Sequence, residues 1–224
     1  MDIGGAPDAS NPGLQPSAAG PWRRERIVDA VDGLLGPRGA LSGRPFILAI
    51  DGRSSSGKTS LAARIHDTVA HSCVVHTDDL AWHHSRFGWD DLLIDRVLIP
   101  LRRGGDVRYR PPEWERKGRA GAIEVPAGVS LVVIDGVGAG RRELAQHIDA
   151  LVWVHADGVD LEHREAVRVA QGEVNKSNQD QWQLEEVPFL ADQRPWERAT
   201  LIVAGTPNVP HDPETEIIVS DRSD

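Results

Sequence analysis

The sequence predicts an α/β protein in which a mainly parallel, five-stranded sheet is covered by helices on both faces, a three-layer α/β/α arrangement. Two observations lead to this prediction. Short apolar, β-branched runs recur along the chain, and helical stretches separate most of them. The runs are continuously apolar rather than alternating, which is typical of parallel strands that are buried on both faces.

The apolar runs predict five core strands in one domain over residues 21–224. They span residues 46–50, 73–76, 131–134, 151–154 and 201–203. A further run at 217–219 predicts an edge strand. A chain of 224 residues is long enough to build a sizeable core around such a sheet.

Helical periodicity predicts the elements between the strands. The predicted helices span residues 22–35, 59–70, 89–101, 141–147 and 160–172. Gly36-Pro37 is expected to end the first of them, and Pro100 to kink or end the third. Residues 104–126 are rich in Gly, Arg and Pro and predict an insertion between the second and third core strands.

The N-terminal segment differs in composition from the rest of the chain. Residues 1–20 consist mainly of Gly, Ala, Pro, Ser and Asn and contain almost no large apolar side chains. Such a segment cannot bury enough surface to offset its ordering entropy, so we expect a disordered tail. It also lacks the pattern of a secretory signal, and the longest apolar run is far shorter than the roughly 20 residues of a membrane span.

Charge and cysteine content limit the range of partners. The net charge is −9, from 25 Lys and Arg against 34 Asp and Glu, which argues against a nucleic-acid polymer or an anionic membrane as a partner. The single cysteine, Cys73, excludes an intramolecular disulfide. We therefore expect a cytoplasmic protein that binds small molecules. The sequence does not decide between a monomer and a homo-oligomer.

The clearest motif is a phosphate-binding loop after the first predicted strand. The octapeptide Gly52-Arg53-Ser54-Ser55-Ser56-Gly57-Lys58-Thr59 matches G-x-x-x-x-G-K-[ST] at every required position, and Ser60 follows it. Its glycines let backbone N–H groups approach phosphate oxygens, and the next helix presents its positive end to them. Lys58 would neutralise the outer phosphates and Thr59 would offer a hydroxyl to Mg²⁺. The motif thus predicts the P-loop NTPase form of the three-layer fold.

The third predicted strand ends in Asp135-Gly136. An acid at the end of a neighbouring strand is the usual second Mg²⁺ ligand of a P-loop protein. Guanine-specific proteins add an Asn-Lys-x-Asp element, but residues 175–178 read Asn-Lys-Ser-Asn and are interpreted as a loop. We therefore expect ATP and Mg²⁺ as the ligands.

Two further groups of residues have the chemistry of a small-molecule kinase. Asp78 and Asp79 follow the second strand, where a carboxylate could position an acceptor hydroxyl, although Asp also favours helix N-caps. Arg164 and Arg168 lie four residues apart on one helical face and could reach a transferred phosphate. The alternative for the arginines is a solvated helix face paired with neighbouring glutamates.

These motifs resemble those of the uridine kinase branch of the P-loop nucleoside kinases. The matching segments are GRSSSGKT, HTDDLAW, VVIDGVGA and HREAVR, within about residues 44–207. The resemblance implies a catalytic role for Asp78, a neighbouring role for Asp79, and Asp135 at a position where the family usually has Glu. It also implies an acceptor region at about residues 80–126 and a lid at about 160–185.

Other candidate substrate contacts lie in the acceptor region. Trp82 could stack on an acceptor, or simply pack half-buried. Tyr109 and Arg110 lie where kinases of this resemblance close over their acceptor. Near the end of the chain, Gly205-Thr206-Pro207 occupies the place of the loop beside adenine, or forms an ordinary turn.

The sequence therefore predicts an ATP-dependent kinase that phosphorylates a hydroxyl of a small molecule. The resemblance favours a nucleoside as the acceptor. Two alternatives stay open: another small alcohol, including an antibiotic, or an ATP-binding hydrolase or switch that has no acceptor.

Overall fold

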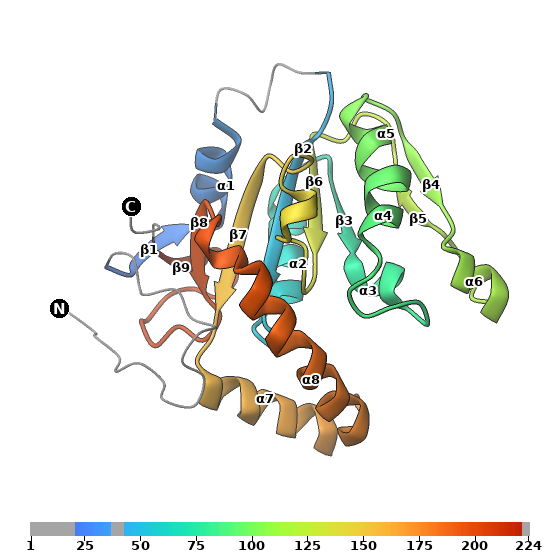
Figure 1. Ribbon diagram of the computed structural model, residues 1–224. Coiled ribbons are helices and arrows are strands. Elements are labelled where there is room, and N and C mark those ends of the chain that lie inside the picture. The colour runs from blue at the N-terminus through green and yellow to red at the C-terminus, as the bar shows by residue number, and fades with distance from the viewer. Residues whose placement is uncertain (1–20, 37–42, 221–224) are drawn as a thin grey trace.

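The structure is a computed structural model that describes residues 21–36 and 43–220. The predicted tail, residues 1–20, lies outside the described residues. The centre of the fold is a seven-stranded sheet (Figure 1). In spatial order its strands are β1 (Arg23–Arg26), β9 (Glu216–Ser220), β8 (Leu201–Ala204), β7 (Ala150–His155), β2 (Phe46–Gly52), β6 (Leu131–Asp135) and β3 (Ser72–His76).

The five predicted core strands form the parallel part of this sheet. Strand β2 lies at its centre, paired with β7 on one side and β6 on the other, and β8 and β3 lie outside these. All seven residues of β2 are buried, as its continuous apolar run predicts. Because the strands are parallel, their carboxyl ends meet at one edge of the sheet, and ligands bind outside that edge in open α/β folds.

Two antiparallel strands extend the sheet at the β8 edge. Strand β9 forms where the run at 217–219 predicts a strand, but the prediction that it lies at the edge is wrong, because β9 lies between β8 and β1. The edge strand is β1, which pairs with β9 from Arg23–Val219 to Arg26–Glu216. The prediction of a helix over 22–35 is wrong for its first residues, because helix α1 begins only at Ile27 (Ile27–Leu35). The highly charged β1 has no apolar pattern and is set by its distant partner, β9.

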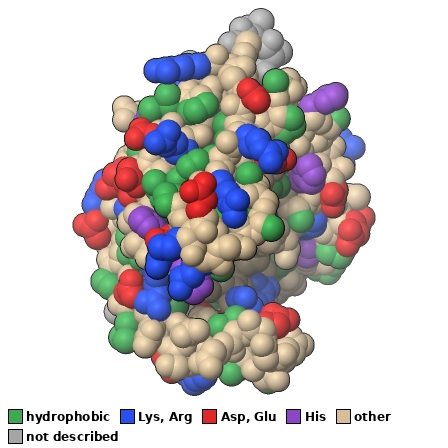
Figure 2. Space-filling model, turned by 90° about the vertical axis from the view of Figure 1, so that its right-hand side faces the viewer, with side chains coloured by type: hydrophobic (Ala, Val, Ile, Leu, Met, Phe, Trp, Pro, Cys, Tyr) green, Lys and Arg blue, Asp and Glu red, His purple; other side chains and the backbone are tan. Residues whose placement is uncertain are grey.

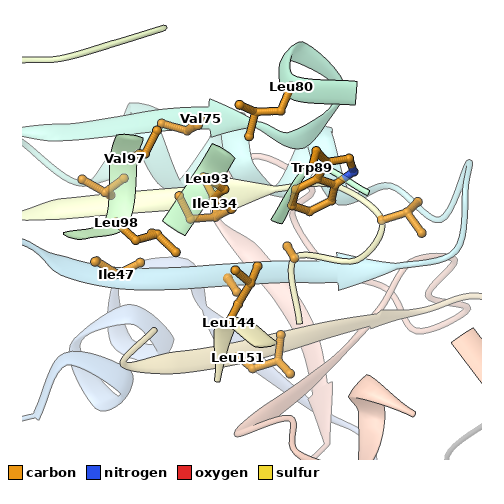
Figure 3. Packing of buried hydrophobic residues seen from close by; sticks show 14 of the residues in the cluster. Ile47, Val75, Leu80, Trp89, Leu93, Val97, Leu98, Ile134, Leu144 and Leu151 are labelled. Carbon is orange, nitrogen blue, oxygen red and sulfur yellow. The ribbon is translucent and has the colours of Figure 1, made fainter. Parts of the chain in front are cut away.

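Helices cover both faces of the sheet and complete the three layers (Figure 1). Helices α1 and α2 (Lys58–Thr68) pack on the face that receives Phe46, Leu48 and Ile50 of the central strand. On the opposite face, the core contains Ile47 and Ala49 together with side chains from the segments after β3 (Figure 3). Successive residues of β2 thus serve two separate cores.

A nearly continuous helix after β3 fills the second core. It consists of α4 (Asp90–Leu93), a π-helical turn (Ile94–Leu98) and α5 (Ile99–Arg102). Pro100 does not end this helix: it lies in the first turn of α5, two residues after the π turn ends at Leu98. Leu93, Val97 and Leu98 point from this helix to the sheet (Figure 3).

The insertion between the second and third core strands has its own small sheet. Strands β4 (Val107–Tyr109) and β5 (Ile123–Val125) are antiparallel, and α6 (Pro112–Lys117) lies between them in the chain. A short helix, α3 (Thr77–Ala81), connects β3 with this side of the molecule.

The C-terminal half differs from the prediction in two places. The helix predicted over 141–147 is only a 3₁₀ turn at Arg142–Leu144, in which Leu144 is the one buried residue. The prediction of a loop at 175–178 is also wrong. There Asn175 caps the long helix α8 (Lys176–Gln193). This helix follows α7 (Gly158–Ala170), and a second 3₁₀ turn (Pro195–Glu197) leads from it to β8.

Helix α8 escaped prediction because it is polar and contains Pro188. Proline removes the hydrogen bond to the carbonyl of Leu184. Leu184 is 77% exposed, so water can satisfy that carbonyl. Across the described residues, no helix combines the length and the apolar character that a membrane span requires.

Candidate functional site

The predicted phosphate loop joins the central strand β2 to helix α2. Gly57 has φ = 102°, a left-handed conformation that favours glycine, and a Cβ on Gly52 would lie 2.5 Å from the Val154 carbonyl oxygen. Lys58 is 7% exposed, and its ammonium donates to the Arg53 carbonyl oxygen at 2.7 Å. The lysine thus spans the loop, and the first turn of α2 follows directly.

The strand register brings Asp135 beside the loop, as the sequence predicts. Residue 135 pairs with Ile50 of β2 and with His76 of β3, so it lies between the ends of both strands. Its Oδ2 accepts a hydrogen bond from Thr59 Oγ1 at 2.9 Å and lies 2.9 Å from His76 Nδ1. The hydrogen bond with this carboxylate raises the pKa of His76.

The Thr59–Asp135 pair fits a magnesium ion. Oδ1 of Asp135 is buried and has no hydrogen-bond partner in the described parts of the chain. A hard cation prefers such carboxylate and hydroxyl oxygens. Those parts contain no cluster of three His, Cys, Asp or Glu side chains suited to a metal, so the remaining ligands would come from phosphate and water.

The two acids after β3 have different surroundings. The N-cap position of α3 is His76, and both acids lie inside the first turn of the helix. Asp79 forms an ion pair with Arg119 at 2.6 Å. Asp78 is open to the cleft described below, yet the surrounding protein desolvates it enough to raise its pKa, against the opposite effect of the Lys58 charge.

Both predicted arginines of α7 reach the phosphate loop. Arg164 donates to the Ser55 carbonyl oxygen at 3.0 Å and to the Gly205 carbonyl oxygen at 2.8 Å. Arg168 lies 3.4 Å from Ser55 Oγ and pairs with Glu173 at 3.3 Å. Both arginines therefore contact the phosphate loop and do not only meet solvent; their action on a transferred phosphate stays a prediction.

One cleft of about 1980 Å³ connects these groups. Its lining includes most of the phosphate loop, Asp78, Asp79, Asp135, Arg164 and Arg168. In Figure 2 this side of the molecule is hollowed above its lowest part, with basic and histidine side chains nearby. The lining also contains Thr206 and Pro207; the position of this loop beside a nucleotide base stays a prediction.

The cleft lining also contains aromatic residues. They include Trp82, in an edge contact with His83 at 4.4 Å between ring centroids, and Trp182 of α8. The buried Nε1 of Trp182 has no hydrogen-bond partner within the described segments. The cleft lining therefore includes two indole rings.

Tyr109 and Arg110 are not among the residues that line the cleft. Tyr109 packs against the hydrophobic core, where burial raises its pKa. Arg110 donates to the Arg119 carbonyl oxygen at 2.7 Å. A contact of either residue with an acceptor stays a prediction; in this structure Arg110 is bonded to the backbone of Arg119.

Sequence reasoning missed Arg119 and His76. Arg119 stacks on Trp114 at 3.6 Å from the ring centroid while it holds Asp79, and Trp114 Nε1 donates to the Asp79 carbonyl oxygen at 2.8 Å. No local motif links residues 40 positions apart. His76 could have been found, because it ends the same strand that precedes Asp78.

The parallel strand order, the central strand with its loop, and helices on both faces decide the fold. The chain has a P-loop NTPase fold. No protein-family model and no curated protein matches the chain.

Several solved structures are similar. A possible uridine kinase from Bacillus stearothermophilus has a TM-score of 0.44 at 20% identity, over 79% of this chain and 98% of that chain. A candidate fructose transport system kinase from Silicibacter sp. TM1040 has a TM-score of 0.49 at 19% identity, over 77% of this chain and 93% of that chain. TT1252 from Thermus thermophilus has a TM-score of 0.42 at 17% identity, over 74% of this chain and 91% of that chain. At these values the likeness carries no functional argument.

Proposed function

We propose that the protein is a kinase that transfers the γ-phosphate of ATP to a hydroxyl of a small molecule. The observation that supports this most is the position of Asp78. Its carboxylate opens into the same cleft as Lys58 and the Thr59–Asp135 pair, with aromatic walls beyond it. A hydrolase or switch needs a water-orienting group but no such acceptor compartment.

Each group has a place in phosphoryl transfer. The loop amides, Lys58 and the α7 arginines bind the phosphates and offset the charge of the transferred group. Thr59 and Asp135 would hold Mg²⁺, which neutralises phosphate charge when it is bound. As the acceptor oxygen bonds to phosphorus and the bond to the ADP oxygen breaks, Asp78 accepts the hydroxyl proton.

We further propose that the acceptor is a nucleoside and that the protein acts in the cytoplasm. Trp82 and Trp182 line the cleft and offer rings on which a flat base can stack. A nucleoside supplies the hydroxyl as well. The motif resemblance to uridine kinases favours the same acceptor.

The test is ATP turnover with a panel of acceptors. Purified protein is incubated with Mg-ATP and uridine, cytidine, purine nucleosides, sugars or aminoglycosides, and both ADP and phosphorylated acceptor are measured. A nucleoside monophosphate formed in step with ADP would support the proposal. Formation of a phosphorylated sugar or antibiotic would show that this compound, and not a nucleoside, is the acceptor. Slow ADP release that no acceptor stimulates would support a hydrolase or switch instead.

A further inference from the structure

Glu186 of helix α8 is a completely buried carboxylate, with 0% of its surface exposed. A buried charge is costly unless it is paired and hydrogen-bonded. Its Oε1 accepts a hydrogen bond from the backbone N–H of Ser54 at 2.6 Å. Its Oε2 lies 3.7 Å from Nε of Arg53. Both partners belong to the first half of the phosphate loop.

The carboxylate contacts the loop from behind. Ser54 lines the cleft, whereas Glu186 lies in the protein interior on the other side of that residue. Burial and the nearby charge of Glu186 raise the pKa of Glu165 on α7, and Arg53 has the opposite effect. The loop is thus backed by the Arg53 side chain, which is 14% exposed and whose charge acts on a carboxylate from each of the two helices α7 and α8.

The same helix is bound to the acceptor side of the cleft. Glu185, next to Glu186, forms an ion pair with Arg86. The ring of Phe87 stacks on Phe189 at 4.1 Å between centroids and contacts Trp182 at 5.3 Å. Arg86 and Phe87 belong to the segment that follows Asp78 and Trp82. Helix α8 therefore joins this segment to the phosphate loop.

We propose that Glu186 is a positioning residue of the nucleotide site. It holds Arg53 and Ser54 in the conformation that receives the phosphates, and α8 links this conformation to the acceptor-side segment through Arg86 and Phe87. The inference rests on the proposed ATP site but not on the identity of the acceptor. Without the carboxylate, the Ser54 N–H and the Arg53 guanidinium lose their partner, and ATP must order the loop as it binds.

Two substitutions separate the hydrogen bond from the charge. Glu186→Gln keeps an oxygen for the Ser54 N–H, so we expect the Kd for Mg-ATP to stay within about threefold of wild type. Glu186→Met has a similar length but removes the acceptor, so we expect a Kd at least about tenfold higher, the scale of a lost hydrogen bond to a charged group. Amide hydrogen exchange at Ser54 in the free protein should become faster in Glu186→Met.

Leu190→Ala is the matched control, since Leu190 is fully buried on the same helix but packs in the hydrophobic core. It should lower the Tm while leaving Ser54 exchange and the Kd for Mg-ATP near wild type. If Glu186→Met bound Mg-ATP like wild type, or if Leu190→Ala weakened binding equally at the same loss of Tm, Glu186 would have only a structural role.

Arg86→Ala tests the link through α8. It also keeps the proposal testable if Glu186→Met does not fold. Arg86 lies near the surface, so the variant should fold, and we expect faster exchange at Ser54. Unchanged exchange at Ser54 would overturn the link. These measurements need no acceptor: a protein that binds Mg-ATP but phosphorylates nothing would refute the kinase proposal and leave this inference standing.

Discussion

The guanidinium of Arg119 lies 2.6 Å from a carboxylate oxygen of Asp79 and forms an ion pair with it. The Asp79 carbonyl oxygen is also bound, by the indole N–H of Trp114. Asp78 is left open to the cleft, where the charges of Lys58, Asp135 and His76 act on it. The two adjacent acids thus have different surroundings, which agrees with the different roles that the motif resemblance implies for them.

We therefore predict that Asp78→Asn loses turnover while ATP binding is retained. Asparagine keeps the size and part of the hydrogen bonding but cannot accept the hydroxyl proton. The rate of acceptor phosphorylation should fall by roughly a hundredfold or more, the scale of general base catalysis, with little change in the Kd for ATP. Asp79→Asn is the control and should lose less, because its carboxylate pairs with Arg119. If Asp79→Asn were the inactive variant, the two roles would be exchanged.

Lys58→Ala should remove nearly all phosphoryl transfer without unfolding the protein. The ammonium contacts the Arg53 carbonyl oxygen and lines the cleft rather than packing in either hydrophobic core. Far-UV circular dichroism and Tm measure the fold, and product formation from Mg-ATP measures transfer. Wild-type turnover in this variant would refute the assignment of the loop as the ATP site.

Divalent metal should be required for turnover, and Asp135→Asn should weaken the apparent affinity for Mg²⁺. Asp135 offers a buried oxygen without a partner among the described residues, next to the Thr59 hydroxyl. We expect the Mg²⁺ concentration for half-maximal activity to rise about tenfold or more in Asp135→Asn, because a ligand charge is lost. Full activity in excess EDTA would contradict the prediction.

The predictable parts of this molecule are those set by local sequence. The five parallel strands follow from apolar runs, and the phosphate loop follows from its residue types. Asp135 reaches Thr59 because the ends of parallel strands share one edge of the sheet. In each case the relevant physical pattern lies within a few neighbouring residues.

The missed parts depend on contacts between distant segments. The polar helix α8 is fixed by contacts such as Glu186 with Ser54 and Phe189 with Phe87, which no helical periodicity reveals. Arg119 and Asp79 meet only because the insertion folds back on α3. Tyr109 lies in the predicted acceptor region, but it packs against the core instead of lining the cleft.

Asp51, the last residue before the phosphate loop glycine, gives the protein a specific pH dependence of stability. It is fully buried and accepts three backbone hydrogen bonds: Oδ1 from Gly52 and Gly138, and Oδ2 from Gly140, at 2.7–3.0 Å. It therefore joins the loop after β2 to the loop after β6. Burial raises the pKa of Asp51 from 3.8 to about 6, because desolvation outweighs these bonds.

A raised pKa means that the folded state binds a proton which the unfolded state releases. Between pH 3.8 and about 6 the native protein holds more protons at this site, so the stability that Asp51 contributes is lost as pH rises through this range. The full difference corresponds to roughly 3 kcal/mol in the free energy of unfolding.

Asp51→Asn should remove this dependence, because asparagine does not titrate. Its Oδ1 can keep the bonds from Gly52 and Gly138, so the variant should fold. Urea unfolding gives the free energy of unfolding of each protein at several pH values from about pH 4 to about pH 7. At each pH the value of the variant is subtracted from that of wild type. We expect this difference to decrease by up to roughly 3 kcal/mol as pH rises. A difference that increases with pH would mean that the three N–H bonds outweigh burial and that the carboxylate is the favoured form of Asp51 in the folded protein.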